Sequence, residues 1–586
     1  MSFNIDTAKP LECPQTGRGE GALLVPHERE SATCWLAAGI LIGFLCLTQL
    51  GMMTSLLAGR IGMAWVAPAA LLLALIGGDQ MGRRMNLGGL WRLSVAALVL
   101  IVIAVAVAMS ASCFDLSFDG QWYHQRAVLQ MEGDWNPLVE PMRRDLIKWT
   151  PYFSKGPWYV AAAIYQLTGQ IEWGKCTTWI TWAAMVLSAF AAGLDWRLRR
   201  MQAAAIAVVV ALHPVVMSEI SSYLVDGVMM ATLLVLIAAV FSGLRRPRTI
   251  VVLVGILAAI FCANTKQNGL IYECIVFAAG GLWCLFRRRE WLLRYTGLVL
   301  LALVLGVGVF GYNPYVTNTI YRHNPLYPAV GTDALEKVNN NLETPKNMVD
   351  RNRFVRLGYA IFGRPGNAPY AGMKNAELMW PFTASLSDIA IYRFQEGRIA
   401  FFGPYFSGAL LLALGLMTWL MLQQNIPRLF PALAALTIIA SLLLSPLQWW
   451  PRIGPQLWLL PLVPVIAVFL DGRSHRATCA AWVLVVLMIV NGGIVAGVGL
   501  TWEINASRTL RGQLAELHES GKTIEVDFRQ FEMSMEEKLK TWDVPYQKMD
   551  PKKKFRDGSE LMSVVDGYPG TIRYRVLPPG AARPPE

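Results

Sequence analysis

Two aspartates four residues apart, Asp115 and Asp119, are the first candidates for chemistry in this chain. They follow an apolar run that ends near Ser110, so their carboxylates can face the boundary between membrane and water. A carboxylate within hydrogen-bond reach of a hydroxyl group can act as a general base when that oxygen attacks. Tyr123 and His124 follow at once and add polar groups for substrate binding. The alternative is that both acids cap helices or lie in a solvated loop.

Three cations and one further acid also stand beside apolar runs. Lys155 lies next to a Gly-Pro pair at the start of such a run, where its amine can hold a phosphate as a point charge. Lys266 and Arg452 lie at the ends of other runs, and an arginine can bind a phosphate through two hydrogen bonds. Asp226 begins another run. The alternative functions are interfacial anchoring for the three cations and helix capping for Asp226.

The sequence contains no pattern typical of a metal centre. None of the nine cysteines forms a CxxC pair. Several cysteines lie in or beside apolar runs, where a thiol behaves as a small hydrophobe: Cys46, Cys262, Cys274, Cys284 and Cys479. We therefore expect no structural metal, and the sequence assigns no definite cofactor. The acid pair Asp115 and Asp119 could still hold a divalent cation weakly.

The composition identifies the elements that must position these residues. Of the 586 residues, 54% are hydrophobic and only 16% are charged, and the mean hydropathy is +0.40. A soluble chain of this length needs more charge to cover its surface, so the chain falls in the membrane class. The net charge of +12 does not indicate nucleic-acid binding, because the arginines cluster in short segments between apolar runs.

The apolar runs predict about thirteen transmembrane helices, since a bilayer core needs about 20 apolar residues per helix. The runs lie at 34–55, 61–78, 90–110, 175–194, 202–220, 225–244, 249–264, 268–286, 293–311, 403–422, 429–446, 456–470 and 479–501.

The arginines predict the orientation. If the N-terminus lies inside, every even-numbered span ends in the cytoplasm, and the segment after it should be basic. Each of these segments is basic, through Arg83, Arg84, Arg92, Arg197, Arg199, Arg200, Arg245, Arg246, Arg248, Arg287, Arg288, Arg289, Arg428, Arg473 and Arg476. Arg60 lies on the opposite side. The polar regions 111–174, 312–402 and the tail from 502 are then outside.

The tail after residue 502 alternates apolar and polar residues at 523–528 and 571–576, which predicts short strands. The predicted fold is thus an all-α polytopic membrane protein whose outer loops carry short helices, with a small α+β appendage at the C-terminus. We find no repeat of fixed period, which argues against a transporter built from inverted repeats.

Three stretches in the first outer region resemble the membrane glycosyltransferases of the GT-C class. The nearest resemblance is to the bacterial aminoarabinose transferases and protein O-mannosyltransferases. Those enzymes carry Asp-Glu-x-Arg-Tyr, then a Gly-Asp-Trp-x-x-Pro-like turn, then Glu-Lys-Pro-Pro. Here residues 119–123 read Asp-Gly-Gln-Trp-Tyr, residues 133–137 read Gly-Asp-Trp-Asn-Pro, and residues 154–157 read Ser-Lys-Gly-Pro. The resemblance implies that Asp119 is the catalytic base and that Lys155 contacts the donor phosphate.

The first stretch also departs from the family pattern. Gly120 stands where the family has glutamate, and Trp122 stands where it has arginine, so any metal or phosphate role of those two positions is absent. Asp115 could take the place of the missing acid.

Later segments match in the same order. Asp226 corresponds to a second outer acid of the family, and Lys266 lies in a Thr-Lys-x-x-Gly-like turn. Residues 323–328 resemble the Gly-Asn-Pro-x-Tyr-Pro turn, and Arg452 precedes a Leu-Pro-x-x-Pro helix. The resemblance covers about 110–465. It implies a cytoplasmic tail (1–33), two extra helices (34–89), a catalytic module (90–311), a large outer loop (312–402), further helices (403–501) and the appendage (502–586).

We therefore predict a glycosyltransferase of cell-envelope glycan biosynthesis in the inner or plasma membrane. It would move a sugar from a polyprenyl-phosphate donor to a hydroxyl of a lipid, glycan or protein at the outer face, with inversion. Two alternatives remain open. An O-antigen-type polymerase or ligase would rely on loop arginines, here Arg351, Arg353, Arg356 and Arg364. A flippase or transporter of lipid-linked oligosaccharide would place ionisable residues at mid-bilayer.

Overall fold

The computed structural model describes residues 26–143, 145–331, 344–366, 375–423, 429–445, 447–550, 558–561 and 572–578. Most of the predicted cytoplasmic tail, two stretches of the predicted loop 312–402, Arg428 and part of the second predicted strand lie outside these ranges.

Helices make up 72% of the structure, and eight segments are long and apolar enough to cross a membrane. They contain α1 (Pro26–Leu57), α2 (Met63–Arg84), α3 (Gly89–Ser112), α6 (Cys176–Asp195), α9 (Asp226–Arg245), α11 (Gln267–Arg287), α12 (Leu292–Leu303) and α20 (His475–Ser520). Shorter apolar helices occupy the other predicted runs: α7 (Arg200–Ala211), α10 (Thr249–Thr265), α17 (Phe406–Leu422), α18 (Leu429–Leu444) and α19 (Leu462–Asp471). The membrane class is therefore supported, and the count of thirteen spans stays a prediction.

The predicted run 202–220 is not one helix. The α7 helix ends at Ala211, and Pro214 begins the separate short helix α8 (Pro214–Ser218). Proline lacks the N–H that would continue the α7 hydrogen bonds, but it is well suited to a first helical turn. The break leaves the following residues, including Glu219, in a buried turn at the head of α9.

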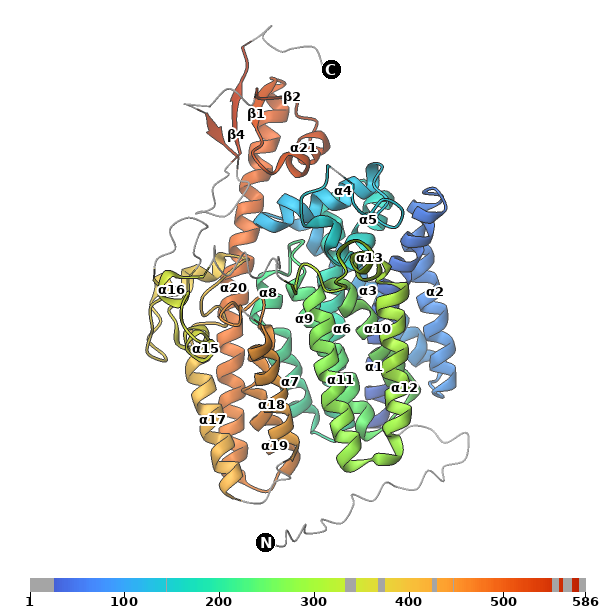
Figure 1. The fold of residues 1–586 in the computed structure, drawn as a ribbon, viewed down its shortest axis with the longest axis vertical. Helices are drawn as coiled ribbons and strands as arrows, with labels where there is room; N and C mark the ends of the chain where they lie inside the picture. The colour runs from blue at the N-terminus through green and yellow to red at the C-terminus, as the bar shows by residue number, and fades with distance from the viewer. Residues whose placement is uncertain are drawn as a thin grey trace.

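The two ends of the helical bundle differ in character (Figure 1). The turn between α11 and α12, which carries residues 287–289, and the turn between α19 and α20 lie at one end. The helices α4 (Gln125–Gly133), α5 (Gly156–Thr168) and α13 (Thr317–Arg322) lie near the opposite end. The arginine-bearing turns and the large polar segments are thus separated, as the predicted orientation requires. Which end faces the cytoplasm stays a prediction.

A small sheet at the C-terminus confirms the predicted appendage. The strand β1 (Ile524–Asp527) pairs in parallel with β2 (Tyr546–Lys548) and antiparallel with β4 (Arg573–Val576), and β3 (Ser559–Glu560) adds to β4. The predicted boundary at residue 502 falls inside α20, whose 46 residues extend for about 70 Å and join the bundle to the appendage.

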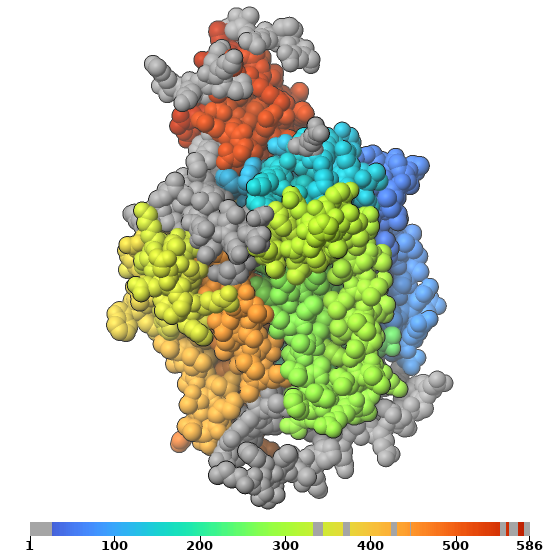
Figure 2. Space-filling model, in the orientation of Figure 1, coloured from blue at the N-terminus to red at the C-terminus, as the bar shows by residue number. Residues whose placement is uncertain are grey.

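The appendage packs on the first outer region rather than hanging free (Figure 2). The ring of Phe531, just before α21 (Glu532–Thr541), meets Phe118 edge to face with centroids 5.4 Å apart. Leu510 and Leu514 of α20 are buried in the same apolar cluster. This contact lies directly beside Asp119, so the appendage helps to hold the segment that carries the candidate base.

Candidate active site

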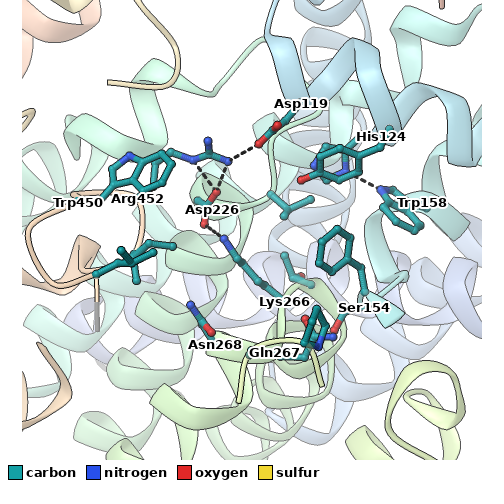
Figure 3. A pocket seen from close by; sticks show the side chains of 18 residues that line it. Asp119, His124, Ser154, Trp158, Asp226, Lys266, Gln267, Asn268, Trp450 and Arg452 are labelled. Atoms are coloured by element: carbon teal, nitrogen blue, oxygen red, sulfur yellow. Dashed lines mark hydrogen bonds and ion pairs between the residues drawn. The ribbon is translucent and has the colours of Figure 1, made fainter. Parts of the chain in front are cut away.

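A cavity lies at the end of the bundle nearer the appendage (Figure 1), and Figure 3 shows the side chains that line it. Its lining comes from segments far apart in the sequence. The first outer region contributes Asp119, Tyr123 and His124. The heads of α5 and α9 contribute Trp158 and Asp226, and the turn between α10 and α11 contributes 265–268. The segment 447–453 closes the opposite wall.

Asp119 reaches the cavity through an unusual turn. It directly precedes a five-residue π-helical turn (Gly120–His124) that leads into α4. A side chain at Gly120 would place its Cβ 2.0 Å from the Asp115 carboxylate and 2.3 Å from the Ser117 hydroxyl, so only glycine fits. The family's glutamate therefore has no room at this position. Asp115 lies before this helical segment, in the non-helical stretch 114–117, and so does not share a helix face with Asp119.

Arg452 is the centre of the site. Its guanidinium lies 3.2 Å from the Asp119 carboxylate, 2.9 Å from Asp226, 3.4 Å from Glu396 and 3.5 Å from Glu219. The arginine is nearly buried, and its guanidinium carbon lies 5.5 Å from the centre of a Trp450 ring. One cation thus lies within ion-pair distance of four carboxylates that are far apart in the sequence or on either side of a turn. We call these residues, together with Lys266, the cavity cluster.

Lys266 supplies the second positive charge of the cavity cluster by pairing with Asp226. The cluster contains four carboxylates and only two cations, which leaves an excess of negative charge if every acid is ionised. Burial and the neighbouring Asp226 charge raise the pKa of Glu219 well above its usual range. Burial and the charge of Asp119 raise the pKa of Glu396 to about 7. Protons on these two glutamates would offset the excess.

Asp119 differs from the other three acids in its access to the cavity. Its side chain is 18% exposed, whereas those of Asp226, Glu219 and Glu396 are at most 5% exposed. Arg452 contacts only Oδ2, and Oδ1 has no hydrogen-bond partner within the described part of the chain. Asp119 is therefore the carboxylate placed to accept a proton from a ligand.

Tyr123 and His124 line the same cavity as neutral groups. Burial and the nearby Asp119 charge raise the pKa of the Tyr123 phenol well above its usual range. Burial and the positive charge of Arg452 lower the pKa of His124 to about 3. The Trp158 indole N–H donates to His124 Nδ1 over 2.7 Å. Both side chains can therefore offer hydrogen bonds without adding charge to the site.

Lys155 does not line the cavity, so its predicted contact with the donor phosphate gains no support. Its amine is fully buried and donates to the carbonyl oxygens of Pro151 (2.9 Å) and Phe153 (2.8 Å) and to Asn313 Oδ1 (2.6 Å). These three bonds use all the protons of the ammonium group. These hydrogen bonds of Lys155 stabilise the turn that precedes α5.

Asp115 does not reach the cavity either, so its predicted catalytic role is not supported. The carboxylate is fully buried and accepts from the backbone N–H groups of Ser117 (2.9 Å) and Tyr223 (2.8 Å) and from the Ser117 hydroxyl (2.7 Å). Since it faces away from Asp119, the two acids do not form a common cation site. No group of three or more potential metal ligands is assembled among the residues described.

Of the eight predicted site residues, six line the cavity: Asp119, Tyr123, His124, Asp226, Lys266 and Arg452. The sequence analysis missed Glu219 and Glu396. Glu219 lies at the end of the predicted run 202–220, and the selected residues also stand at the ends of runs, so the same rule could have found it. Glu396 lies in the outer loop 312–402 with no motif around it, and no signal in the sequence points to it.

Comparison with known proteins gives no match: no family model, no curated protein and no solved structure is significantly similar to this chain. The function must therefore be inferred from the geometry and chemistry of the cavity itself.

Proposed function

We propose that this protein is a membrane glycosyltransferase that transfers a sugar from a polyprenyl-phosphate donor to an acceptor hydroxyl at the outer face of the membrane. One observation carries the proposal: an accessible carboxylate, Asp119, stands 3.2 Å from a cation, Arg452, in a cavity at the end of apolar helices. A base and a phosphate-binding charge are the two groups that this reaction needs.

The walls of the cavity suit an amphiphilic ligand. Apolar and aromatic side chains such as Phe153, Leu447 and Trp450 stand beside the charged groups. A second cavity, almost entirely apolar, lies between α6, α9, α11, α18 and α19 and is lined by Phe241, Trp283 and Ile466. An isoprenoid chain could occupy such a groove within the bilayer.

In the mechanism, Asp119 removes the proton of the acceptor hydroxyl as that oxygen attacks the anomeric carbon. The new C–O bond forms on the face opposite the phosphate, so the configuration inverts. The bond between the anomeric carbon and the phosphate oxygen breaks, and polyprenyl phosphate leaves with the bonding electrons. Arg452 and Lys266 stabilise the charge that develops on the leaving phosphate.

The polymerase alternative gains no support from its arginines. Arg353 and Arg356 donate to backbone carbonyl groups, and Arg364 pairs with Asp388 at 3.4 Å. None of the described loop arginines at 351, 353, 356 and 364 lines the cavity. The flippase alternative likewise has no observation that favours it over transfer.

The test supplies membranes containing the protein with radiolabelled polyprenyl-phosphate sugars and measures transfer to an extractable or precipitable acceptor. We expect transfer by the wild type and a loss of about 100-fold or more in Asp119→Asn. Glu140→Gln, which neutralises an exposed acid of the same outer region, is the matched control and should remain active. Absence of transfer by the wild type with every donor would overturn the proposal.

A further inference from the structure

His124 holds a hydrogen-bond donor whose direction is fixed by its surroundings. The imidazole is 2% exposed and lines the cavity beside Asp119 and Lys266. Its Nδ1 lies 2.7 Å from Nε1 of Trp158. An indole N–H can only donate a hydrogen bond, so Nδ1 must be the acceptor.

This bond fixes the tautomer of the ring. A neutral imidazole carries one N–H, and because Nδ1 accepts from Trp158 the proton lies on Nε2. Burial and the nearby cations Arg452 and Lys266 keep the pKa of His124 low, so the ring stays neutral at physiological pH. The Nε2–H group is therefore a neutral donor at physiological pH.

No described residue accepts a hydrogen bond from Nε2. Buried polar groups are nearly always paired, so an unpaired donor beside a cavity points to a partner that arrives with the ligand. The two ring nitrogens point in nearly opposite directions, and Trp158 stands on the side of His124 away from Asp119 and Arg452 (Figure 3). Tyr123 packs against the imidazole with ring centroids 4.2 Å apart and ring planes tilted by 34°, which limits rotation of the imidazole.

We propose that the Nε2–H of His124 donates a hydrogen bond to a phosphate oxygen of the lipid-linked donor, with Trp158 as the positioning residue that fixes the tautomer. This inference rests on the proposed function. Both cations of the cavity cluster already face carboxylates, so a phosphate must share them with those acids. A neutral N–H with no carboxylate partner can bind the phosphate without that competition.

Two substitutions separate the roles of the ring nitrogens. The amide group of asparagine lies close to the position of Nδ1, and the amide nitrogen of glutamine can reach that of Nε2. His124→Asn therefore keeps an acceptor for Trp158 and removes the donor at the cavity. His124→Gln keeps a donor at the cavity and gives up the bond to Trp158. The two variants change size and charge in similar ways, so each controls for the other.

The first experiment measures binding of polyprenyl phosphate without sugar, and of the complete donor, to the full-length protein in nanodiscs. We expect His124→Asn to bind both about 10-fold more weakly than the wild type and His124→Gln to bind within about threefold of it. Wild-type affinity in His124→Asn would overturn the inference. Loss confined to the sugar-bearing donor would overturn the phosphate assignment. If the wild type binds neither lipid, the proposed function itself fails.

The second experiment tests the tautomer without reference to activity. The chain has only six histidines, so selective ¹⁵N labelling with His124→Gln as the reference assigns the His124 signals. We expect a protonated Nε2 and an unprotonated Nδ1 in the wild type, and a shift of the Nδ1 signal in Trp158→Phe, where the hydrogen bond from the indole is lost. A proton on Nδ1 in the wild type would overturn the inference whatever the transfer assay shows.

Discussion

Two buried charge clusters begin four residues apart in the first outer region, and they are built differently. The cavity cluster, which contains Asp119, sets four carboxylates against two cations and opens to a cavity. The second cluster starts at Asp115 and includes Glu172, Lys175 and Lys538; we call it the sealed cluster. It contains two carboxylates and two cations, and all four side chains are buried.

The sealed cluster satisfies its own charges. Glu172 accepts from Lys175 at 2.7 Å, from Lys538 at 3.2 Å and from the backbone N–H of Asp115 at 2.9 Å. Lys538 comes from α21, so these contacts tie the appendage to the outer region. Charges that are balanced and closed to ligands hold a fold together. The cavity cluster has more carboxylates than cations and opens to a cavity, so a ligand that binds there can change the protonation and the pairing of its charges.

The largest expected difference between the clusters comes from removing one cation from each. In Arg452→Gln we expect transfer per folded molecule to fall about 100-fold or more, because the charge beside the leaving phosphate is lost. In Lys175→Gln we expect less folded protein, but transfer per folded molecule within about threefold of the wild type. The measurement is transfer normalised to the monodisperse fraction after solubilisation. If transfer per folded molecule fell equally in both variants, the proposed functional difference between the two clusters would be wrong.

The sealed cluster should respond to removal of a charge through stability. Lys538→Met leaves Glu172 with one cation in a buried site, which costs about 3–5 kcal/mol for a broken buried pair. Adding Glu172→Gln removes the stranded charge, so the double variant should recover part of the lost melting temperature. Thermal unfolding in detergent measures both effects. A single variant as stable as the wild type would mean that the appendage is not held by this cluster.

Lys155 allows the sequence-based and structure-based assignments to be separated. Because its amine donates to three buried oxygens, Lys155→Met leaves these acceptors unpaired and should destabilise the protein by about 1–3 kcal/mol or more. The KM for the donor should stay within about twofold in the folded fraction. If instead KM rises about tenfold and the melting temperature is unchanged, Lys155 contacts the phosphate as the sequence predicted.

The smallest expected effect is a dependence of donor affinity on pH. With a pKa of about 7, Glu396 is protonated at lower pH and ionised at higher pH. Its negative charge beside Arg452 competes with the donor phosphate, so affinity should fall a few-fold as the pH rises from about 6 to about 8. Glu396→Gln should bind the donor with nearly the same affinity at both pH values. A wild-type affinity that rises over this interval would contradict the assignment.

The sequence predicted the membrane class and most of the cavity because hydropathy locates the ends of apolar helices. Asp226, Lys266 and Arg452 were found this way, since each stands at the end of an apolar run and these ends meet at one level of the bundle. Asp119 was found by its position after a run and by its resemblance to a family motif. The alternation of apolar and polar residues in the tail likewise predicted the strands of the appendage.

The direction of each side chain could not be predicted. Hydropathy places Asp115 and Lys155 near the same end of the bundle as the cavity. It does not predict that the side chain of Asp115 points into the sealed cluster and that of Lys155 into a turn. Asp115 lies in the non-helical stretch 114–117, whereas Asp119 lies in the helical segment that follows it, so the two acids do not share the one face on which an ordinary helix would set them. Glu396 reaches Arg452 from a loop without periodicity, so only the tertiary fold brings the two together.

The central claim is that chemistry occurs at Asp119 and not at Asp115, and a comparison of two amide variants tests it most directly. Asp119→Asn and Asp115→Asn are purified, the folded fraction of each is measured, and single-turnover transfer is followed with saturating donor. The account predicts a rate about 10²–10⁴-fold below wild type for Asp119→Asn, with donor affinity retained. It predicts a rate near wild type for the folded fraction of Asp115→Asn. Wild-type rates in Asp119→Asn, or a selective loss of rate in Asp115→Asn, would contradict it.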